Sequence, residues 1–141
     1  MARVTVVNDS SAFLDLMRDL LATLGHEMVG FEAVTASIEQ LVDSTPDLLI
    51  VDLVLQDTPQ VMSGWELLVL ARSHRHLLSV PVILCSGDLW ELEKRADDLE
   101  QIANVHVRTK PFDVDDICDL IERLVSESAR DGRIPRVLGA T

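Results

Sequence analysis

Four polar residues of this chain stand where short strand-forming runs would end. Asp52 lies in the apolar run from Leu48 to Leu55, and the other three residues are Asp9, Ser86 and Lys110. The preceding runs are rich in Val, Ile and Leu, which favour strands buried in a parallel sheet. Because the carboxyl ends of parallel strands meet at one edge of the sheet, we expect these side chains to lie close together.

Phosphoryl transfer is the chemistry that this group of residues could perform. Two neighbouring carboxylates, here Asp9 and Asp52, repel each other unless a cation lies between them, and Mg²⁺ prefers oxygen ligands. The Lys110 ammonium and the Ser86 hydroxyl would complete a pocket for phosphoryl oxygens, because phosphoryl transfer depends on positioning and charge neutralisation. We therefore predict that Asp52 accepts the phosphoryl group and that Mg²⁺ binds between the two acids.

Five strand-and-helix repeats position these residues. Runs of β-branched residues alternate with segments whose apolar residues recur at helical spacing, a pattern typical of an α/β fold with a parallel sheet covered on both faces. We predict a doubly wound, five-stranded parallel sheet with five helices. The expected strands are 3–7, 27–31, one from 48 that brings Asp52 to its end, 80–85 and 105–109, and the expected helices are 11–24, 36–43, 65–73, 89–101 and 114–125.

Capping residues support three of these helices. Ser10 or Ser11 can cap the first helix, and Gly25 stands at its end, where glycine is favoured. Asp88 and Asp113 can cap the fourth and fifth helices in the same way.

The chain resembles the receiver domain of bacterial two-component response regulators, from Val4-Thr5-Val6-Val7-Asn8-Asp9 to Lys110-Pro111-Phe112-Asp113. The resemblance covers about residues 3–126 and implies a flavodoxin-like fold. It implies a protein that takes a phosphoryl group from the phosphohistidine of a sensor histidine kinase or a histidine phosphotransfer protein. Asp52 would become an acyl phosphate. We therefore expect self-catalysed phosphotransfer and dephosphorylation only, rather than an enzyme with a separate substrate.

The resemblance also implies a set of Mg²⁺ ligands. Asp9 and Asp52 would bind the ion directly, and the backbone carbonyl of Val54 would be a further ligand. Asn8 stands where the family usually has another acid, and its amide could orient a metal-bound water. Since a carboxylate is the stronger partner for a hard cation, we predict weaker Mg²⁺ binding than an acid at this position would give.

The remaining implied roles concern the phosphoryl group. Ser86 would bond to it, Lys110 would pair with it, and Pro111 would follow a cis peptide bond, an isomer that is common only before proline. Gly87 would leave room for a phosphodonor or an attacking water, or is simply a turn glycine.

Two further departures from the family concern the rim of the site and the signalling switch. Gly64 lies farther along the chain from Asp52 than is usual, so the intervening loop is longer, and Asp57 in that loop either approaches the metal or is solvated. Val107 stands where the family often has Tyr or Phe. The neighbouring His106 could substitute for that aromatic, although we expect it to face solvent on an edge strand.

Composition limits the classes of protein that fit. With 141 residues, of which 48% are hydrophobic, the chain suits one domain. We expect residues 1–126 to form the receiver domain and residues 127–141 a flexible tail. The net charge of −12 argues against direct binding to nucleic acid. No apolar stretch reaches the roughly 20 residues that span a membrane, so we expect no membrane contact and a cytoplasmic location. Cys85 and Cys118 should be reduced core residues.

Proteins are the expected partners. Residues 127–141 are too few for an output module, so we expect a stand-alone receiver that signals by altered contact with a downstream protein. The resemblance suggests the first helix as the kinase-docking surface, and the fourth helix, fifth strand and last helix as the readout surface. Trp90 is either an exposed partner contact there or a partly buried ring that closes the core. A homodimer through the readout surface is left open.

Two other functions compete with this one. In a pseudo-receiver, which is a constitutive protein-interaction module, Asn8, Val107 and the longer loop would mark a disused switch, but the joint presence of the four strand-end residues argues against it. A flavodoxin-like cofactor binder or a small hydrolase fits less well, because no glycine-rich phosphate loop opens a helix. His74 and His76 lack a third ligand for a metal and are expected to be surface residues.

Overall fold

Five parallel strands and six helices make up the fold. The computed structural model describes residues 2–34, 37–53, 62–111 and 113–130. The strands form one sheet in the order β2-β1-β3-β4-β5, which confirms the predicted α/β fold. They are β1 Arg3–Val7, β2 Glu27–Phe31, β3 Leu48–Asp52, β4 Val82–Ser86 and β5 Val105–Thr109. The helices are α1 Ser11–Leu24, α2 Glu39–Asp43, α3 Gly64–Ser73, α4 Leu89–Lys94, α5 Ala96–Glu100 and α6 Val114–Arg130.

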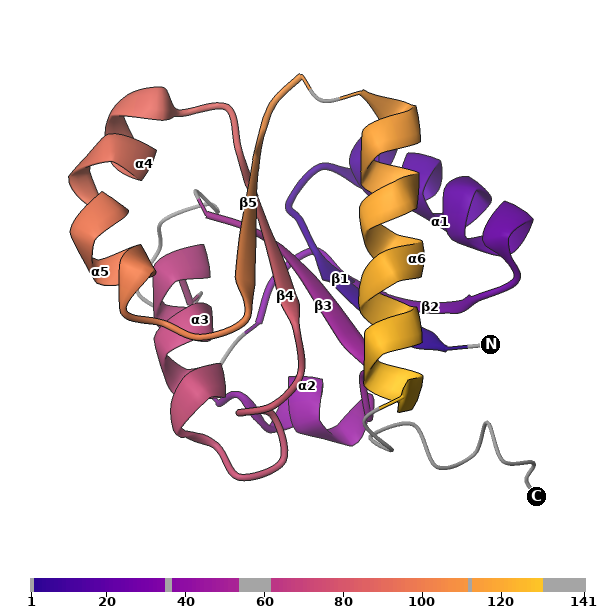
Figure 1. Ribbon diagram of the computed structural model, residues 1–141, viewed down its shortest axis with the longest axis horizontal. Helices are drawn as coiled ribbons and strands as arrows, with labels where there is room; N and C mark the ends of the chain where they lie inside the picture. The colour runs from indigo at the N-terminus through magenta and orange to yellow at the C-terminus, as the bar shows by residue number, and fades with distance from the viewer. Residues whose placement is uncertain (1, 35–36, 54–61, 112, 131–141) are drawn as a thin grey trace.

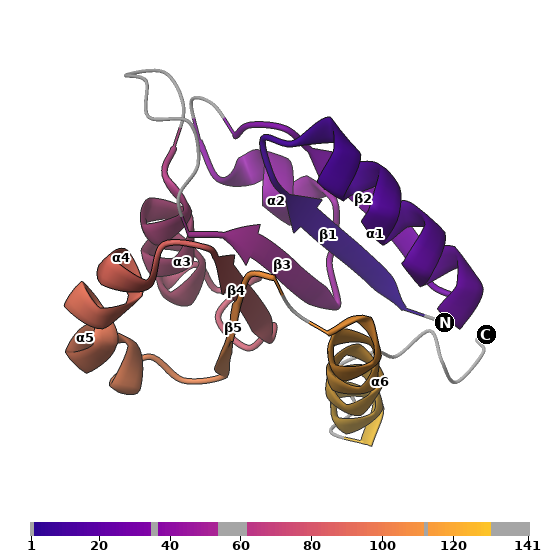
Figure 2. The ribbon, with the colours of Figure 1, turned by 90° about the horizontal axis from the view of Figure 1, so that it is seen from above.

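Helices cover both faces of the sheet, as Figures 1 and 2 show. On one face, α1 and α6 bury Met17 and Ile117 against alternate strand residues such as Ile50. On the other face, α2 and α3 pack residues such as Leu67 against the intervening strand residues, for example Leu49. Because successive strand side chains point to opposite faces, a central strand that is covered twice needs a continuous apolar run.

The predicted helix caps are present. The Ser10 hydroxyl accepts a hydrogen bond from the N–H of Phe13 at 3.2 Å, and Gly25 ends α1 with a φ of 84°. Asp88 and Asp113 each accept a backbone N–H at the start of α4 and α6, respectively. These bonds satisfy N–H groups that have no partner within the first helical turn. The structure confirms that residues 10, 25, 88 and 113 mark helix ends.

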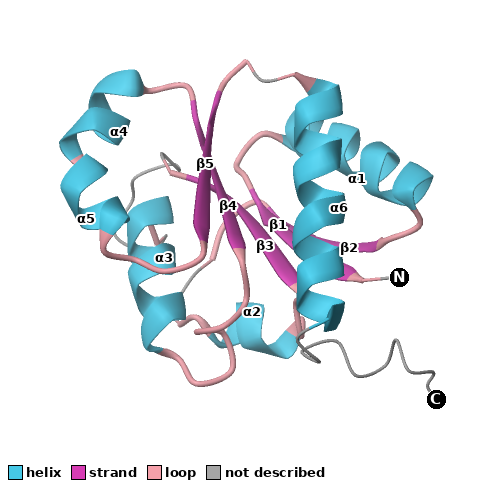
Figure 3. Ribbon diagram, in the orientation of Figure 1, coloured by secondary structure: helices cyan, strands magenta, loops and turns pink. Residues whose placement is uncertain are grey.

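The single helix expected over residues 89–101 is wrong, because this segment forms two short helices (Figure 3). Arg95 separates them, with φ −96° and ψ 1°, and it is the C-cap of α4 and the N-cap of α5. Its guanidinium lies 4.6 Å from the centre of the Trp65 ring. Neither helix has a buried residue, so little core packing is available to hold one continuous helix.

Other boundaries differ less. Helix α2 begins at Glu39, whereas the sequence predicted a start at residue 36, and β3 ends at Asp52, as the sequence predicted. Helix α6 continues to Arg130, past the expected domain end at residue 126. Within the described parts of the chain, no helix is long and apolar enough to cross a membrane.

Gly64 fixes the start of α3 against the end of β3. A Cβ atom at this position would lie 1.9 Å from the backbone oxygen of Asp52 and 2.7 Å from that of Leu53. Only a residue without a side chain allows this approach. The helix start and the strand end that carries Asp52 are therefore packed backbone to backbone.

Candidate functional site

Asp52 is a buried carboxylate at the carboxyl end of a central strand. It is the last residue of β3, lies opposite Cys85 of β4 in the sheet register, and is 8% exposed. Two donors converge on its Oδ2 atom: the Lys110 Nζ at 2.5 Å and the Asn8 Nδ2 at 3.1 Å. Burial removes water from this carboxylate, which costs free energy. The hydrogen bonds from the ammonium and the amide offset much of that cost.

Lys110 reaches Asp52 from the end of the edge strand. Its backbone N–H donates to the carbonyl of Ser86 at 2.8 Å, which places the residue directly beyond the β4–β5 pairing. The ammonium also lies 4.9 Å from the centre of the Phe13 ring, a cation–π contact. The bond to Pro111 is cis, as predicted.

Ser86 ends β4 and is fully buried. Its Oγ accepts a hydrogen bond from the N–H of Asp88 at 2.9 Å, so the hydroxyl proton can still be donated to a ligand. A Cβ atom at Gly87 would meet only the Lys110 Cβ, at 3.7 Å. Among the described residues, only Lys110 therefore lies within contact distance of this position beside Ser86.

The two residues after β1 occupy different environments. Asn8 is 1% exposed and contacts Asp52, whereas Asp9 is exposed and has no hydrogen bond or ion pair with any described residue. Strands β1 and β3 are neighbours with Val7 opposite Val51, so both residues leave the sheet beside Asp52. The contact of Asn8 with Asp52 was not predicted from the sequence.

The described residues at this edge of the sheet offer two carboxylates to a hard cation, but no larger set of ligands. Mg²⁺ commonly binds one or two carboxylates and keeps several waters, a requirement that Asp9 and Asp52 could meet. Across the described residues, no group of three or more His, Cys, Asp or Glu side chains gathers in a metal-binding arrangement. Val54, an expected ligand, and Asp57, a possible one, lie outside the described residues.

Comparison with known proteins identifies the family. The model of the response regulator receiver domain matches residues 4–122. The chain belongs to this family. The sheet order agrees with this family, and so does the presence of carboxylate, hydroxyl and ammonium groups at the strand ends.

The curated relatives are longer than this receiver. The DNA-binding transcriptional regulator NtrC of Escherichia coli is 29% identical over 123 residues, which is 87% of this chain and 24% of that protein. The chain therefore spans about a quarter of that relative's length.

Solved structures with the same fold include two other receivers. A CheY-like receiver domain protein from Methanospirillum hungatei superposes with a TM-score of 0.77 at 24% identity, over 94% of this chain and 99% of that one. The receiver domain of a sensor histidine kinase from Pseudomonas aeruginosa, which has a magnesium ion coordinated in its active site cleft, has a TM-score of 0.68 at 19% identity, over 89% and 98%.

Two cysteines of this receiver are free thiols. Burial raises the pKa of Cys85, next to the site, to about 12, and the Lys110 and Asp52 charges act in opposite directions with smaller effects. Its thiol stays protonated near neutral pH, as expected for a core residue. Cys118 is only half-buried, so its assignment to the core is partly wrong.

The residues around the family's usual switch position lie on opposite faces of the sheet. Val107 packs against the α2–α3 side of the core. His106 lies on the edge strand β5, as expected, and is half-buried. Burial, with the neighbouring charges of Arg123 and Arg108, holds its pKa below 6.5.

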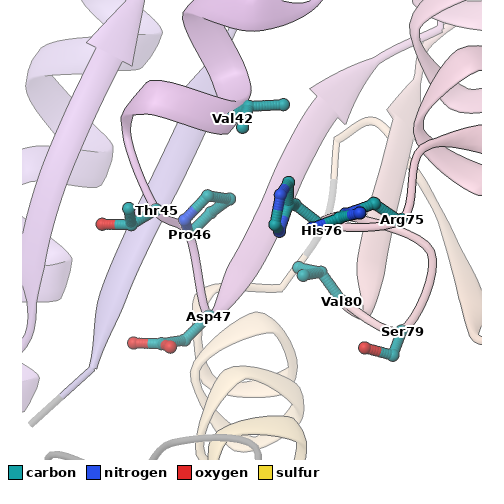
Figure 4. Close-up of a pocket in the computed structure, with 8 residues that line it drawn as sticks. All are labelled: Val42, Thr45, Pro46, Asp47, Arg75, His76, Ser79 and Val80. Atoms are coloured by element: carbon teal, nitrogen blue, oxygen red, sulfur yellow. The ribbon is translucent and has the colours of Figure 1, made fainter.

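A cavity of about 490 Å³ lies at the edge of the sheet opposite Asp52 (Figure 4). Its walls come from the segments that precede β3 and β4, including Pro46, Arg75, His76 and Val80. Because Asp52 ends β3 and the cavity walls precede this strand, the cavity is separate from the candidate site. His74, beside the cavity wall, pairs with Glu39 at 3.2 Å.

Trp90 is 69% exposed at the start of α4, and its neighbour Leu89 is 63% exposed. The alternative in which Trp90 is a partly buried ring that closes the core is therefore wrong. Lys94 lies 5.1 Å from the centre of its ring. Trp65 is the tryptophan that packs against the core.

Proposed function

We propose that this receiver takes a phosphoryl group from a phosphohistidine onto Asp52 in the presence of Mg²⁺, and signals by altered protein contacts. The main support is the buried Asp52 carboxylate at the end of β3, which has the Lys110 ammonium 2.5 Å from its Oδ2. Ser86 and Asp9 leave the neighbouring strands at the same edge of the sheet.

The proposed step moves one phosphoryl group between two proteins. An Asp52 carboxylate oxygen attacks phosphorus, an O–P bond forms, and the bond from phosphorus to the donor imidazole nitrogen breaks. The electron pair of that bond stays with the imidazole. Lys110 then pairs with a phosphoryl oxygen, and the Ser86 hydroxyl donates its proton to another oxygen in a hydrogen bond. These groups stabilise charge on the phosphoryl oxygens during transfer.

Mg²⁺ would neutralise charge between the acids and the phosphoryl oxygens when it is bound. Asp9 and Asp52 are the described residues that would hold it, and the magnesium ion in the active site cleft of the Pseudomonas aeruginosa receiver supports a cation at the corresponding edge of this sheet. Asn8 contributes no negative charge, so we propose that binding is weaker than in a site with a third acid.

The proposed partners are a sensor histidine kinase or a histidine phosphotransfer protein upstream, and another protein downstream. The exposed Leu89 and Trp90 side chains support a protein contact at the start of α4. The net charge of −12 disfavours direct contact with nucleic acid. The homodimer, the cytoplasmic location and the absence of membrane contact stay predictions.

Treatment with a small-molecule phosphodonor and Mg²⁺, followed by intact mass measurement, tests the proposal. We expect wild type to gain one phosphoryl group and Asp52→Asn to gain none. Asp47→Asn is the matched control, because Asp47 is also buried but precedes β3, and it should be phosphorylated like wild type. An unmodified wild type that also shows no response to beryllofluoride would favour the pseudo-receiver.

A further inference from the structure

The sheet fixes the position of Asn8. This residue follows β1 directly, its backbone N–H donates to the carbonyl of Phe31 at 3.0 Å, and it is 1% exposed. The pairing of Val7 with Val51 places the next residue of β1 beside Asp52 of β3. The side chain therefore reaches the acceptor from a rigid element.

Both ends of the Asn8 amide are engaged. The Oδ1 atom accepts the N–H of Ser10 at 2.8 Å, and the Nδ2 atom donates to the Asp52 Oδ2 at 3.1 Å. An amide can be built in either orientation, and its neighbours decide which one is correct. The Ser10 N–H can only donate and an ionised carboxylate can only accept, so the amide nitrogen must face Asp52.

We propose that Asn8 is a positioning residue that holds the Asp52 carboxylate before any cation binds. Together, Lys110 and Asp52 make a balanced pair of one cation and one anion, and Asn8 adds a donor without adding charge. An acid at position 8 would keep the bond from Ser10, but it would place a second anion about 3 Å from the Asp52 Oδ2. One ammonium would then face two carboxylates. This role rests on the proposed function of Asp52 as the acceptor.

The expected consequence is an acceptor site whose stability depends little on Mg²⁺. With Asn8, the carboxylate has its donors in the absence of metal. With an acid, the apo protein would be destabilised by repulsion, and a divalent cation would relieve that repulsion. The residue at position 8 would thus set how strongly cation binding is coupled to folding.

Thermal unfolding of the full chain, in EDTA and over a series of MgCl₂ concentrations, tests this role without a phosphodonor. We expect the Tm of Asn8→Asp in EDTA to lie about 5 °C below wild type, and to recover in Mg²⁺. The Tm of wild type should rise in Mg²⁺ by less than half of the rise in Asn8→Asp. The Mg²⁺ concentration at half-effect should be about tenfold lower for Asn8→Asp.

Two further variants separate the amide bond from the added charge. Asn8→Ala should lower the Tm in EDTA, and Mg²⁺ should not restore it beyond the small shift of wild type. Gln101→Glu adds one negative charge at an exposed residue and should behave like wild type in both conditions.

Three results would overturn the role of Asn8: an Asn8→Asp protein as stable as wild type in EDTA, equal Mg²⁺ shifts in the two proteins, or an Asn8→Ala protein as stable as wild type in EDTA. Because only unphosphorylated protein is measured, failure of phosphotransfer to Asp52 would leave these results unchanged. Conversely, normal phosphorylation of Asp52 would not support the role of Asn8 if the stability measurements contradicted it.

Discussion

At the scale of the residue, the proposed phosphoryl transfer depends on the pair formed by Lys110 and Asp52. The Lys110 side chain is 29% exposed and that of Asp52 is 9% exposed, so the pair is partly shielded from water. Lys110→Ala would leave a mostly buried carboxylate without its charged partner. We expect a loss of about 1–3 kcal/mol in the free energy of unfolding and a phosphorylation rate lower by about 100-fold.

Urea unfolding and phosphorylation kinetics, both with the same Mg²⁺ concentration, measure these two effects. Lys94→Ala is the matched control, because Lys94 is the chain's only other lysine and is exposed. It should change neither quantity by much. A Lys110→Ala protein that phosphorylates at the wild-type rate would contradict the role of the ammonium.

The two thiols should differ in reactivity. Burial raises the pKa of both, but only Cys85 is fully buried, with a pKa of about 12. We expect iodoacetamide to modify Cys118 in the native protein and Cys85 only after unfolding, because the accessible thiolate is the reactive form. Mass spectrometry of peptides from native and denatured samples measures this. Equal rates of modification of the two cysteines in the native protein would show that the α1–α6 side of the core opens readily.

At the scale of the element, the start of α3 depends on a glycine that touches the end of the strand carrying Asp52. Gly64→Ala would place a Cβ 1.9 Å from the backbone oxygen of Asp52, so α3 and β3 must move apart. We expect the free energy of unfolding to fall by more than about 2 kcal/mol. Gly87→Ala is the comparison, because its nearest contact would be at 3.7 Å.

Denaturant unfolding of both glycine variants measures the difference. Gly87→Ala should keep most of the wild-type stability, since a separation of 3.7 Å is an ordinary van der Waals contact. Similar losses in the two variants would argue that the backbone approach at Gly64 is not what fixes α3.

His106, on β5, should make the free energy of unfolding depend on pH. Burial and the Arg123 and Arg108 charges lower the pKa of His106 in the folded protein, although Glu127 acts in the opposite direction. The unfolded chain therefore binds more protons as the pH falls below about 6.5. This contribution is fully present above that pH and is lost as the pH falls towards the folded-state pKa.

Unfolding experiments between about pH 7 and about pH 5 check the sign. Wild type should lose more stability on acidification than His106→Gln, because the carboxylates are common to both proteins and cancel in the difference. An identical pH dependence in the two proteins would contradict the shift.

The sequence predicted the elements that depend on local patterns. Apolar runs located the five strands, including β2 at residues 27–31, and Ser10 and Gly25 marked the ends of α1. The break at Arg95 was missed because it accompanies a contact with Trp65, which is far away in the sequence.

The candidate site was likewise predictable only where it depends on local patterns. Asp52, Ser86 and Lys110 could be grouped because each stands at the carboxyl end of a strand, and the parallel sheet brings strand ends together. The Asn8 hydrogen bond depends on the register of β1 against β3, and the Gly64 contact depends on how α3 enters. Neither geometry is encoded in a short motif. The roles of Asp9 and Val54 as metal ligands stay predictions.

At the scale of the whole molecule, one short path joins the acceptor site to an exposed surface. The Ser86 Oγ accepts the N–H of Asp88, and Asp88 caps the helix that carries Trp90. If the Ser86 side chain moves towards a phosphoryl group, this bond would carry the movement to the start of α4. We expect phosphorylation to change the fluorescence of Trp90 more than that of Trp65, which packs against the core.

Single-tryptophan variants separate the two signals. Trp65→Phe should keep the fluorescence response to beryllofluoride and Mg²⁺, whereas Trp90→Phe should lose most of it. A response that follows Trp65 instead would show that the site communicates with α3 rather than with α4.

Chemical trapping tests the central claim most directly. After phosphorylation of wild type by a phosphodonor with Mg²⁺, borohydride reduces an aspartyl phosphate to homoserine, and tandem mass spectrometry identifies the modified residue. If Asp52 is the acceptor, homoserine will appear at position 52 and will be absent without the phosphodonor. Homoserine at Asp9 or at another acid, or none at all under conditions that phosphorylate a known receiver, would contradict it.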